Sequence, residues 1–275
     1  DMIEWTPYEG VKQILEGKIR GIHAVKASYA SMRRLVFNVA SPPFNNKKMR
    51  QAVALAIDKK ELIDAAYFGF GEPVDQRYPV GHFWYIDGVS APARDLAKAR
   101  ALLKEAGYQD ESIVVSTYPG IYEPVAITLQ AQLKKVGINI KIEMMDSPAV
   151  ISQQRRGDFT LGLGGGSIRT DPSEAYGESI RCEPDLKRRR GNRSGFCDKD
   201  TENLLDQAET ELDPAKRKAI FRQLLSKYFE EVPEIYVGYG PRFFSLRDYV
   251  RGFNVSGDDR YRWWGGGFNY MWLDK

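Results

Sequence analysis

Helix and strand patterns alternate from about residue 39 to residue 238, and this alternation is the strongest constraint on the fold. Asp95 precedes a helical repeat of apolar residues that ends at Gly107, and a short apolar strand follows. A second helical repeat ends at Gly137, after which residues 138–144 alternate apolar and polar side chains, as in a half-buried strand. The pattern predicts an α/β fold with a mixed sheet and flanking helices.

Residues 35–63 add a strand, a turn that contains two prolines, and two short helices. Either Asn45 or Asn46 is expected to cap the first helix, because a side-chain oxygen can accept a free helical N–H group. Asp58 and Glu61 have the spacing of a capping box at the start of the second helix.

The remaining elements are shorter and less regular. They are expected as strands at residues 1–5, 113–115, 159–163 and 235–239, and as helices at residues 8–16, 146–157, 204–208 and from residue 213 onward. Residues 240–275 show no clear periodicity.

The composition argues against several classes of protein. The 275 residues include 40 Lys and Arg against 37 Asp and Glu, a balance that does not favour nucleic-acid binding. No apolar run approaches the ~20 residues of a membrane-spanning helix. The N-terminus lacks the basic segment and the apolar segment of a secretion signal. We expect either that a signal was removed or that the chain is a fragment, and we favour the fragment.

Catalytic and metal-binding patterns are weak. The two histidines, His23 and His82, lie far apart and form no Ser/His/Asp or Cys/His arrangement, which argues against the alternative of an α/β hydrolase domain. Neither histidine has a second metal ligand at a suitable spacing. We therefore expect no enzyme activity, no metal and no cofactor.

Two cysteines, Cys182 and Cys197, enclose a loop of about 15 residues rich in Arg, Gly and Asn. In an oxidising compartment a disulfide here would contribute about 3 kcal/mol through loop entropy. The alternative is a pair of free thiols in a cytosolic chain. The loop also contains a basic run, residues 187–193, which we interpret as a solvated loop or as one edge of a binding cleft.

The best candidate for a binding site is the glycine-rich segment that follows the strand at residues 159–163. Its consecutive glycines Gly164, Gly165 and Gly166, with Ser167, would let a ligand approach the backbone closely. The alternative is a flexible turn. The spacing matches neither a dinucleotide fingerprint nor a P-loop, and no helix is obvious after the segment.

Two stretches carry a family resemblance. Residues 35–63 resemble the middle signature of the family 5 extracellular solute-binding proteins, and residues 99–108 resemble a second signature of that family. The resemblance implies a type II periplasmic binding-protein fold whose two lobes close over a peptide, nickel or related solute for an ABC importer. It implies that the solute is bound and released without a chemical reaction. Some members of the family also carry a disulfide in the region of the two cysteines.

The resemblance also divides the chain. Residues 1–38 would belong to the first lobe, residues 39–239 would form the complete C-terminal ligand-binding lobe (domain III), and residues 240–275 would return to the first lobe. It implies a monomer in the periplasm, or a lipoprotein at the outer face of the membrane, with a small-molecule solute and an ABC permease as partners.

The ligand prediction concerns one position. In peptide-binding members an aspartate just before an Asp-Pro or Glu-Pro pair, here Asp171-Pro172, holds the α-ammonium group of the peptide. Counted forward from the preceding strand, that position is Arg169. Counted back from Asp171-Pro172, it is Ile168. Neither residue is acidic. Arg169 would instead hold a carboxylate or phosphate, as in an opine or a sugar phosphate. Its alternative role is an ion pair with Asp171 or Glu174.

Two further residues complete the predicted site. Tyr118 lies near a strand end, where an aromatic residue commonly lines the cleft in this family, and Arg181 lies close to the glycine-rich segment in sequence. For Tyr118 the alternative is core or loop packing.

Overall fold

The computed structural model describes residues 1–4, 6–166, 169–253 and 271–274. The helices of these residues are α1 (Tyr8–Leu15), α2 (Lys47–Ala56), α3 (Lys59–Tyr67), α4 (Leu96–Ala106), α5 (Tyr122–Lys134), α6 (Ser147–Arg156), α7 (Pro172–Ile180), α8 (Lys199–Thr210) and α9 (Pro214–Glu231). The strands are β1 (Met2–Glu4), β2 (Ile22–Phe37), β3 (Glu72–Pro73), β4 (Ile113–Thr117), β5 (Ile140–Met144), β6 (Leu161–Gly166), β7 (Glu234–Arg247), β8 (Val250–Arg251) and β9 (Trp272–Leu273).

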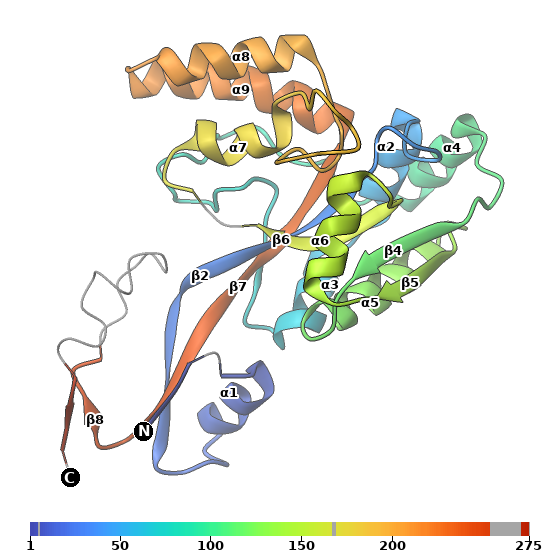
Figure 1. Ribbon diagram of the computed structural model, residues 1–275. Helices are drawn as coiled ribbons and strands as arrows, with labels where there is room; N and C mark the ends of the chain where they lie inside the picture. Colours follow the sequence, from blue (N-terminus) through green and yellow to red (C-terminus); the bar gives the residue numbers. More distant parts are fainter. Residues whose placement is uncertain (5, 167–168, 254–270, 275) are drawn as a thin grey trace.

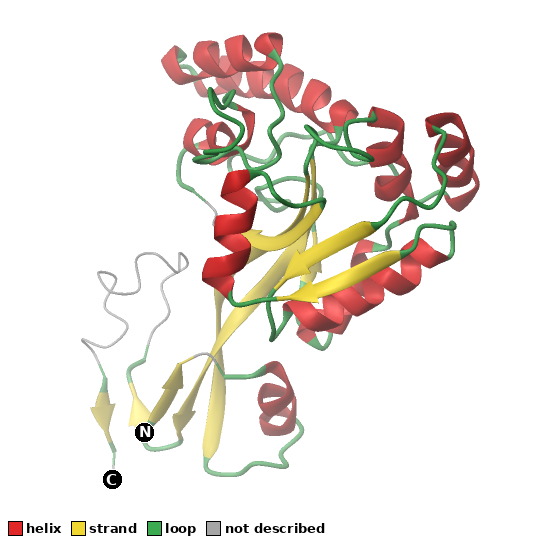
Figure 2. Ribbon diagram, turned by 45° about the vertical axis from the view of Figure 1, so that its right-hand side comes forward, coloured by secondary structure: helices red, strands yellow, loops and turns green. Residues whose placement is uncertain are grey.

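One mixed sheet organises the described residues. Its strand order is β1-β7-β2-β6-β4-β5, with β3 also paired to β7. Strand β2 is antiparallel to both of its neighbours, whereas β4 is parallel to β5 and β6. Helix α6 lies on one face of β4, β5 and β6, and α5 lies on the other face (Figure 2). The predicted α/β class, with a mixed sheet and flanking helices, is confirmed.

Strands β2 and β7 are far longer than their sequence patterns indicated. The expected strands at 35–38 and 235–239 are the ends of a ribbon that pairs residues 22–36 with residues 234–247. This ribbon runs from the main body to the region of α1 and β1 (Figure 1). The predicted boundary at residue 239 therefore lies inside β7, and the boundary at residue 38 lies one residue after β2.

Most helix starts follow the predicted side-chain caps. The Asn46 side chain accepts a hydrogen bond from the Lys48 N–H, which decides between the two asparagines. Aspartates cap α3, α4, α6 and α9 in the same way, and glycines end α4 and α6 in the left-handed conformation.

One helix was not expected. Helix α7 begins directly after the glycine-rich segment, with Asp171 as its N-cap and Pro172 in its first turn. This Asp-Pro pair is the same start signal that opens α9. The expectation that no helix follows the glycines was therefore wrong, because the nearby Gly177 and serines weakened the helical pattern.

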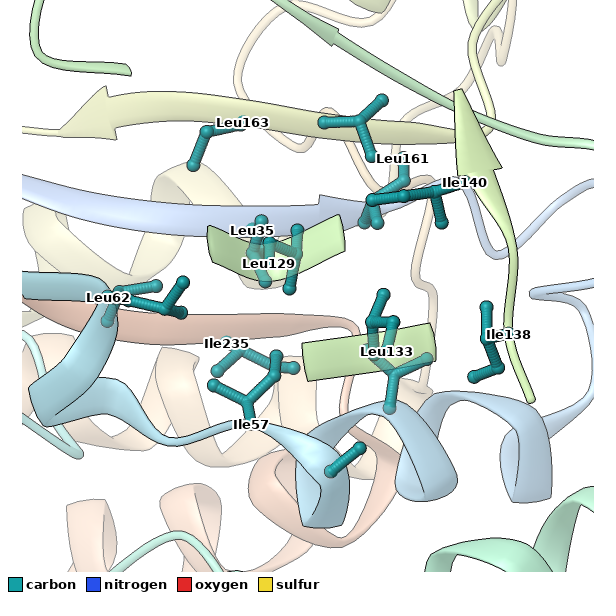
Figure 3. Close-up of a cluster of buried hydrophobic side chains, with 14 of the residues drawn as sticks. Leu35, Ile57, Leu62, Leu129, Leu133, Ile138, Ile140, Leu161, Leu163 and Ile235 are labelled. Atoms are coloured by element: carbon teal, nitrogen blue, oxygen red, sulfur yellow. The ribbon is translucent and has the colours of Figure 1, made fainter. Parts of the chain in front are cut away.

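Two hydrophobic clusters hold the main body together. The first lies among α2–α5 and the strands, where Leu129 and Leu133 of α5 face Leu35 of β2 and Ile235 of β7 (Figure 3). The second joins α7, α8 and α9 to the middle of β7. A smaller third cluster, which includes Ala27 and Phe244, lies farther along the β2–β7 ribbon.

A close contact lies where the ribbon leaves the body. A Cβ atom at Gly240 of β7 would lie 1.8 Å from Cε1 of Tyr67, so the Tyr67 ring occupies the space of a side chain. That ring packs edge-on against Tyr8 of α1 at 5.0 Å and lies 5.7 Å from the Arg33 guanidinium of β2. Glycine at residue 240 thus permits a contact that involves α3, α1 and β2.

None of the helices that the structure describes has both the length and the apolar character needed to cross a lipid bilayer.

Candidate functional site

The predicted glycines form one wall of a cavity. Gly164, Gly165 and Gly166 lie on β6, opposite Arg34, Arg33 and Met32 of β2 in the antiparallel register. The cavity has a volume of about 260 Å³. The residues around it come from β2, β6, α6 and the loops at residues 118 and 193; they are Arg34, Val36, Tyr118, Tyr122, Val150, Ile151, Gln154, Gly164, Gly165, Gly166 and Arg193.

The glycines have different surroundings. A Cβ atom at Gly162 would lie 2.5 Å from Nε2 of Gln154, so packing excludes a side chain there. At Gly164 no atom lies within 4 Å of the Cβ position, although this residue lines the cavity. Glycine at residue 164 therefore keeps space open for a bound group.

Aromatic side chains form another wall. Tyr118, one of the predicted residues, packs against Tyr122, with ring centroids 4.3 Å apart. The Arg33 guanidinium lies 4.6 Å from the centre of the Tyr122 ring. Burial, as the largest cause, raises the pKa of Tyr122, so its hydroxyl stays protonated and neutral. Tyr122 was not among the predicted site residues.

Arg34 is a cavity residue that the sequence patterns did not single out. Its Nη1 atom donates to Glu234 Oε2 at 2.7 Å and to Ser179 Oγ at 3.1 Å. Glu234 starts β7, which is 200 residues away in sequence, so no local pattern could indicate this ion pair. The positive charge of Arg34 is therefore balanced inside the protein.

Glu234 is the centre of a buried polar cluster behind the cavity. Besides Arg34, it accepts hydrogen bonds from the hydroxyls of Tyr228 at 2.9 Å and Tyr236 at 2.7 Å. The Arg77 guanidinium lies 3.7 Å from the same carboxylate. Burial raises the pKa of Glu234, but Arg34, Arg77 and the two hydroxyls lower it to about 2. The carboxylate is ionised at neutral pH.

Arg193 reaches the cavity from the basic run. Its Nη1 atom donates to Oε1 of Gln154 on α6 at 2.9 Å. Burial, together with the positive charges of Arg34 and Arg155, lowers its pKa. Within the described ranges no carboxylate forms an ion pair with Arg193. One end of the basic run thus forms part of the cavity, whereas Lys187 and Arg188 are exposed.

Arg169 and Asp171 are engaged elsewhere. Arg169 forms ion pairs with Glu174 at 3.1 Å and Glu178 at 2.6 Å on α7, in line with its alternative role. Asp171 caps α7 and forms two hydrogen bonds of 2.7 Å with Arg217. Neither residue lines the cavity. A ligand role for them stays a prediction.

The predicted residues Arg181, Cys182 and Cys197 fall outside the cavity. Arg181 pairs with Asp206 and Glu209 of α8, both at 2.7 Å. Cys182 and Cys197 form a disulfide, which closes the loop that carries Arg193. Ser167 lies outside the described residues. The described residues contain no group of three or more His, Cys, Asp or Glu side chains arranged to hold a metal ion.

A second cavity, of about 400 Å³, lies where α1 approaches β7 and the start of α5. Its walls are mainly apolar and include Tyr8, Ile121, Pro124 and Phe243. It lacks the predicted residues, so the cavity on β6 is the better candidate for recognition of a specific solute.

Comparison with known proteins agrees with this architecture. The sequence profile described as bacterial extracellular solute-binding proteins, family 5 Middle, matches residues 1–184. The dipeptide-binding protein of Escherichia coli (strain K12) is 28% identical over 230 residues, which cover 81% of this chain and 43% of that protein.

Two solved structures have the same fold. The ABC transporter-associated periplasmic binding protein DppA from Helicobacter pylori, in complex with peptide STSA, has a TM-score of 0.84 at 23% identity, with coverage of 96% of this chain and 51% of that chain. The PBP AgaA from A. tumefacien R10, in complex with agropinic acid, has a TM-score of 0.83 at 24% identity, with coverage of 100% and 56%. The chain thus spans about half the length of the proteins that it resembles.

Proposed function

This chain belongs to the family 5 bacterial extracellular solute-binding proteins, and we propose that it supplies one ligand-binding lobe of the substrate-binding component of an ABC importer. The complete protein captures a small solute between two lobes and delivers it to a membrane permease. The solute is peptide-like, or it is an anionic conjugate such as an opine or a sugar phosphate. The names of the related proteins, which are binding proteins and not enzymes, support this proposal.

The observation that carries the proposal is the open cavity on β6. Three glycines bring bare backbone to its wall, and Gly164 leaves room where a side chain would stand. Among the described residues, arginine, glutamine and tyrosine side chains surround it. Such a site can hold a polar solute.

We further propose the division of the chain into residues 1–38 and 240–275 of a first lobe and residues 39–239 of the ligand-binding lobe. The separate hydrophobic cluster around Ala27 and Phe244 supports it, because that cluster is distinct from the two clusters of the main body. In this division the β2–β7 ribbon connects the lobes. Lobe closure is then driven by the preferential affinity of the solute for the closed state.

The proposed location is the periplasm, or the outer face of the membrane in the case of a lipid anchor. The Cys182–Cys197 disulfide supports an oxidising compartment. The proposed partners are the solute and the permease, and the protein acts as a monomer without nucleic acid.

Native mass spectrometry of the complete encoded protein, purified from its source, tests the function. We expect a small molecule that remains bound in the gas phase and is released on denaturation. A protein that carries no small molecule, and whose thermal unfolding no candidate solute shifts, would refute the proposal.

A further inference from the structure

Among the described residues around the cavity on β6, Arg193 is an arginine whose charge no ion pair balances. We propose that Arg193 holds an anionic group of the solute, either a carboxylate or a phosphate, in this cavity. This inference rests on the proposed solute-binding function and specifies the chemical class of the solute.

The first argument compares the nearby arginines. Arg34 is paired with Glu234, and Arg169 is paired with Glu174 and Glu178. Arg193 forms one hydrogen bond, to the neutral side chain of Gln154, and no ion pair among the described residues. Of the two arginines among the described residues around the cavity, Arg34 and Arg193, Arg193 is therefore the one that can meet an external anion.

The second argument is electrostatic. Burial and the positive charges of Arg34 and Arg155 all lower the pKa of Arg193, and they outweigh the opposite effects of Glu178 and Tyr118. A half-buried cation that other cations repel is stabilised when an anion displaces water beside it. A charged solute group at this place would bind more tightly than at an exposed arginine.

The third argument is geometric. Gln154 holds Nη1 of Arg193 at 2.9 Å, so the guanidinium is oriented before a ligand arrives. The open Cβ position of Gly164 belongs to the same cavity and leaves space for the group that Arg193 binds. A planar guanidinium can donate two parallel hydrogen bonds to a carboxylate or a phosphate.

The size of the cavity fits a single group better than a whole solute. Its volume of about 260 Å³ is below the ~300–1,000 Å³ typical of a complete small-molecule site. The cavity therefore accommodates the anionic end of a solute, while the remainder of the solute extends out of this lobe.

The test uses the complete encoded protein and three variants. Arg193→Gln removes the charge, Arg193→Lys keeps it, and Arg156→Gln is the matched control, since it removes an exposed arginine charge from α6 outside the cavity. Small molecules released by denaturation are identified by mass spectrometry. Calorimetry on ligand-stripped protein then uses Ala-Ala, succinate and glycerol 3-phosphate, each beside a counterpart that lacks the anionic group: Ala-Ala amide, succinamide or glycerol.

We expect the released compound, or the bound probe, to carry a carboxylate or a phosphate. Arg193→Gln should weaken its binding by about 10- to 100-fold, which is typical for a lost charge-assisted hydrogen bond. Arg193→Lys should bind more tightly than Arg193→Gln but more weakly than the unaltered protein, because lysine keeps the charge and loses the paired hydrogen bonds. Arg156→Gln should retain all of the affinity. Circular dichroism verifies that each variant is folded. The Ala-Ala, succinate and phosphate pairs distinguish a peptide carboxylate from an organic acid and from a phosphate ester.

Two results would overturn the inference while the proposed function stands. One is a released compound or preferred probe that has no anionic group. The other is an Arg193→Gln variant that binds its solute as tightly as the unaltered protein. If instead no compound is released and none of the probes binds, the proposed function fails, and this inference fails with it.

Discussion

Replacement of Glu234 by glutamine tests the buried cluster behind the cavity. The Glu234 carboxylate is the negative partner of Arg34, whose side chain is 9% exposed, and lies 3.7 Å from Arg77, whose side chain is 1% exposed. The Glu234→Gln variant keeps the shape of the side chain at residue 234 but leaves two buried guanidinium groups without this anion. Breaking a buried ion pair in this way costs about 3–5 kcal/mol of folding free energy.

The pKa of Glu234 gives a second measure of the same effect. A lowering from 4.5 to about 2 corresponds to about 3 kcal/mol of stability at neutral pH. Because the folded-state pKa is the lower one, this stability is present above pH 4.5 and is lost as the pH falls toward 2. The two measures agree, so we expect Glu234→Gln to destabilise the protein by about 3 kcal/mol at pH 7.

The assay is urea unfolding of the complete protein, followed by tryptophan fluorescence at pH 7 and at pH 3. The stability difference between the unaltered protein and Glu234→Gln should shrink at pH 3 to roughly half or less. The control is Glu230→Gln, which removes an exposed carboxylate paired with Lys47 and should leave the unfolding midpoint unchanged. A loss below about 1 kcal/mol at pH 7, or an equal difference at both pH values, would refute the reasoning.

Three further predictions concern the site and its supports. Cys197→Ser should lower the free energy of unfolding by about 3 kcal/mol, because it opens a loop of 15 residues, and denaturant titration measures it. Gly164→Leu should abolish solute binding in calorimetry and preserve the thermal midpoint, because its side chain enters open space in the cavity. Asp171→Ala should destabilise the protein by about 1–2 kcal/mol in urea titration, because α7 loses its cap and Arg217 loses its partner.

Each of these predictions has a result that contradicts it. A Cys197→Ser variant with the same free energy of unfolding as the unaltered, oxidised protein would contradict the first prediction. Unchanged affinity in Gly164→Leu would place the solute outside this cavity. An Asp171→Ala variant as stable as the unaltered protein would show that Ser173 and the first turn of α7 need no cap.

Local signals predicted the elements well. The caps Asn46 and Asp95 act within three residues of themselves, so a short stretch of sequence contains all the necessary information. The same locality explains what could not be predicted. The full length of β2 follows from its pairing with β7, about 200 residues away, and the balancing of Arg34 by Glu234 depends on that pairing.

The candidate site was predicted in part. Gly164 and Tyr118 do lie around one cavity, whereas the anionic solute stays a prediction. Sequence spacing could not show that two glutamates of the following helix pair with Arg169, whose ligand role stays a prediction. Arg193 lay within a run of basic residues, where no local feature distinguishes the one that points inward.

The Tyr67–Gly240 contact has a consequence for how this chain can change by mutation. Even alanine at residue 240 would push the Tyr67 ring aside, and the displaced ring would disturb both Tyr8 and Arg33. Since these neighbours belong to separate elements, one added methyl group would need several simultaneous substitutions to become tolerable. Residue 240 is therefore a position where we expect sequence drift to stop.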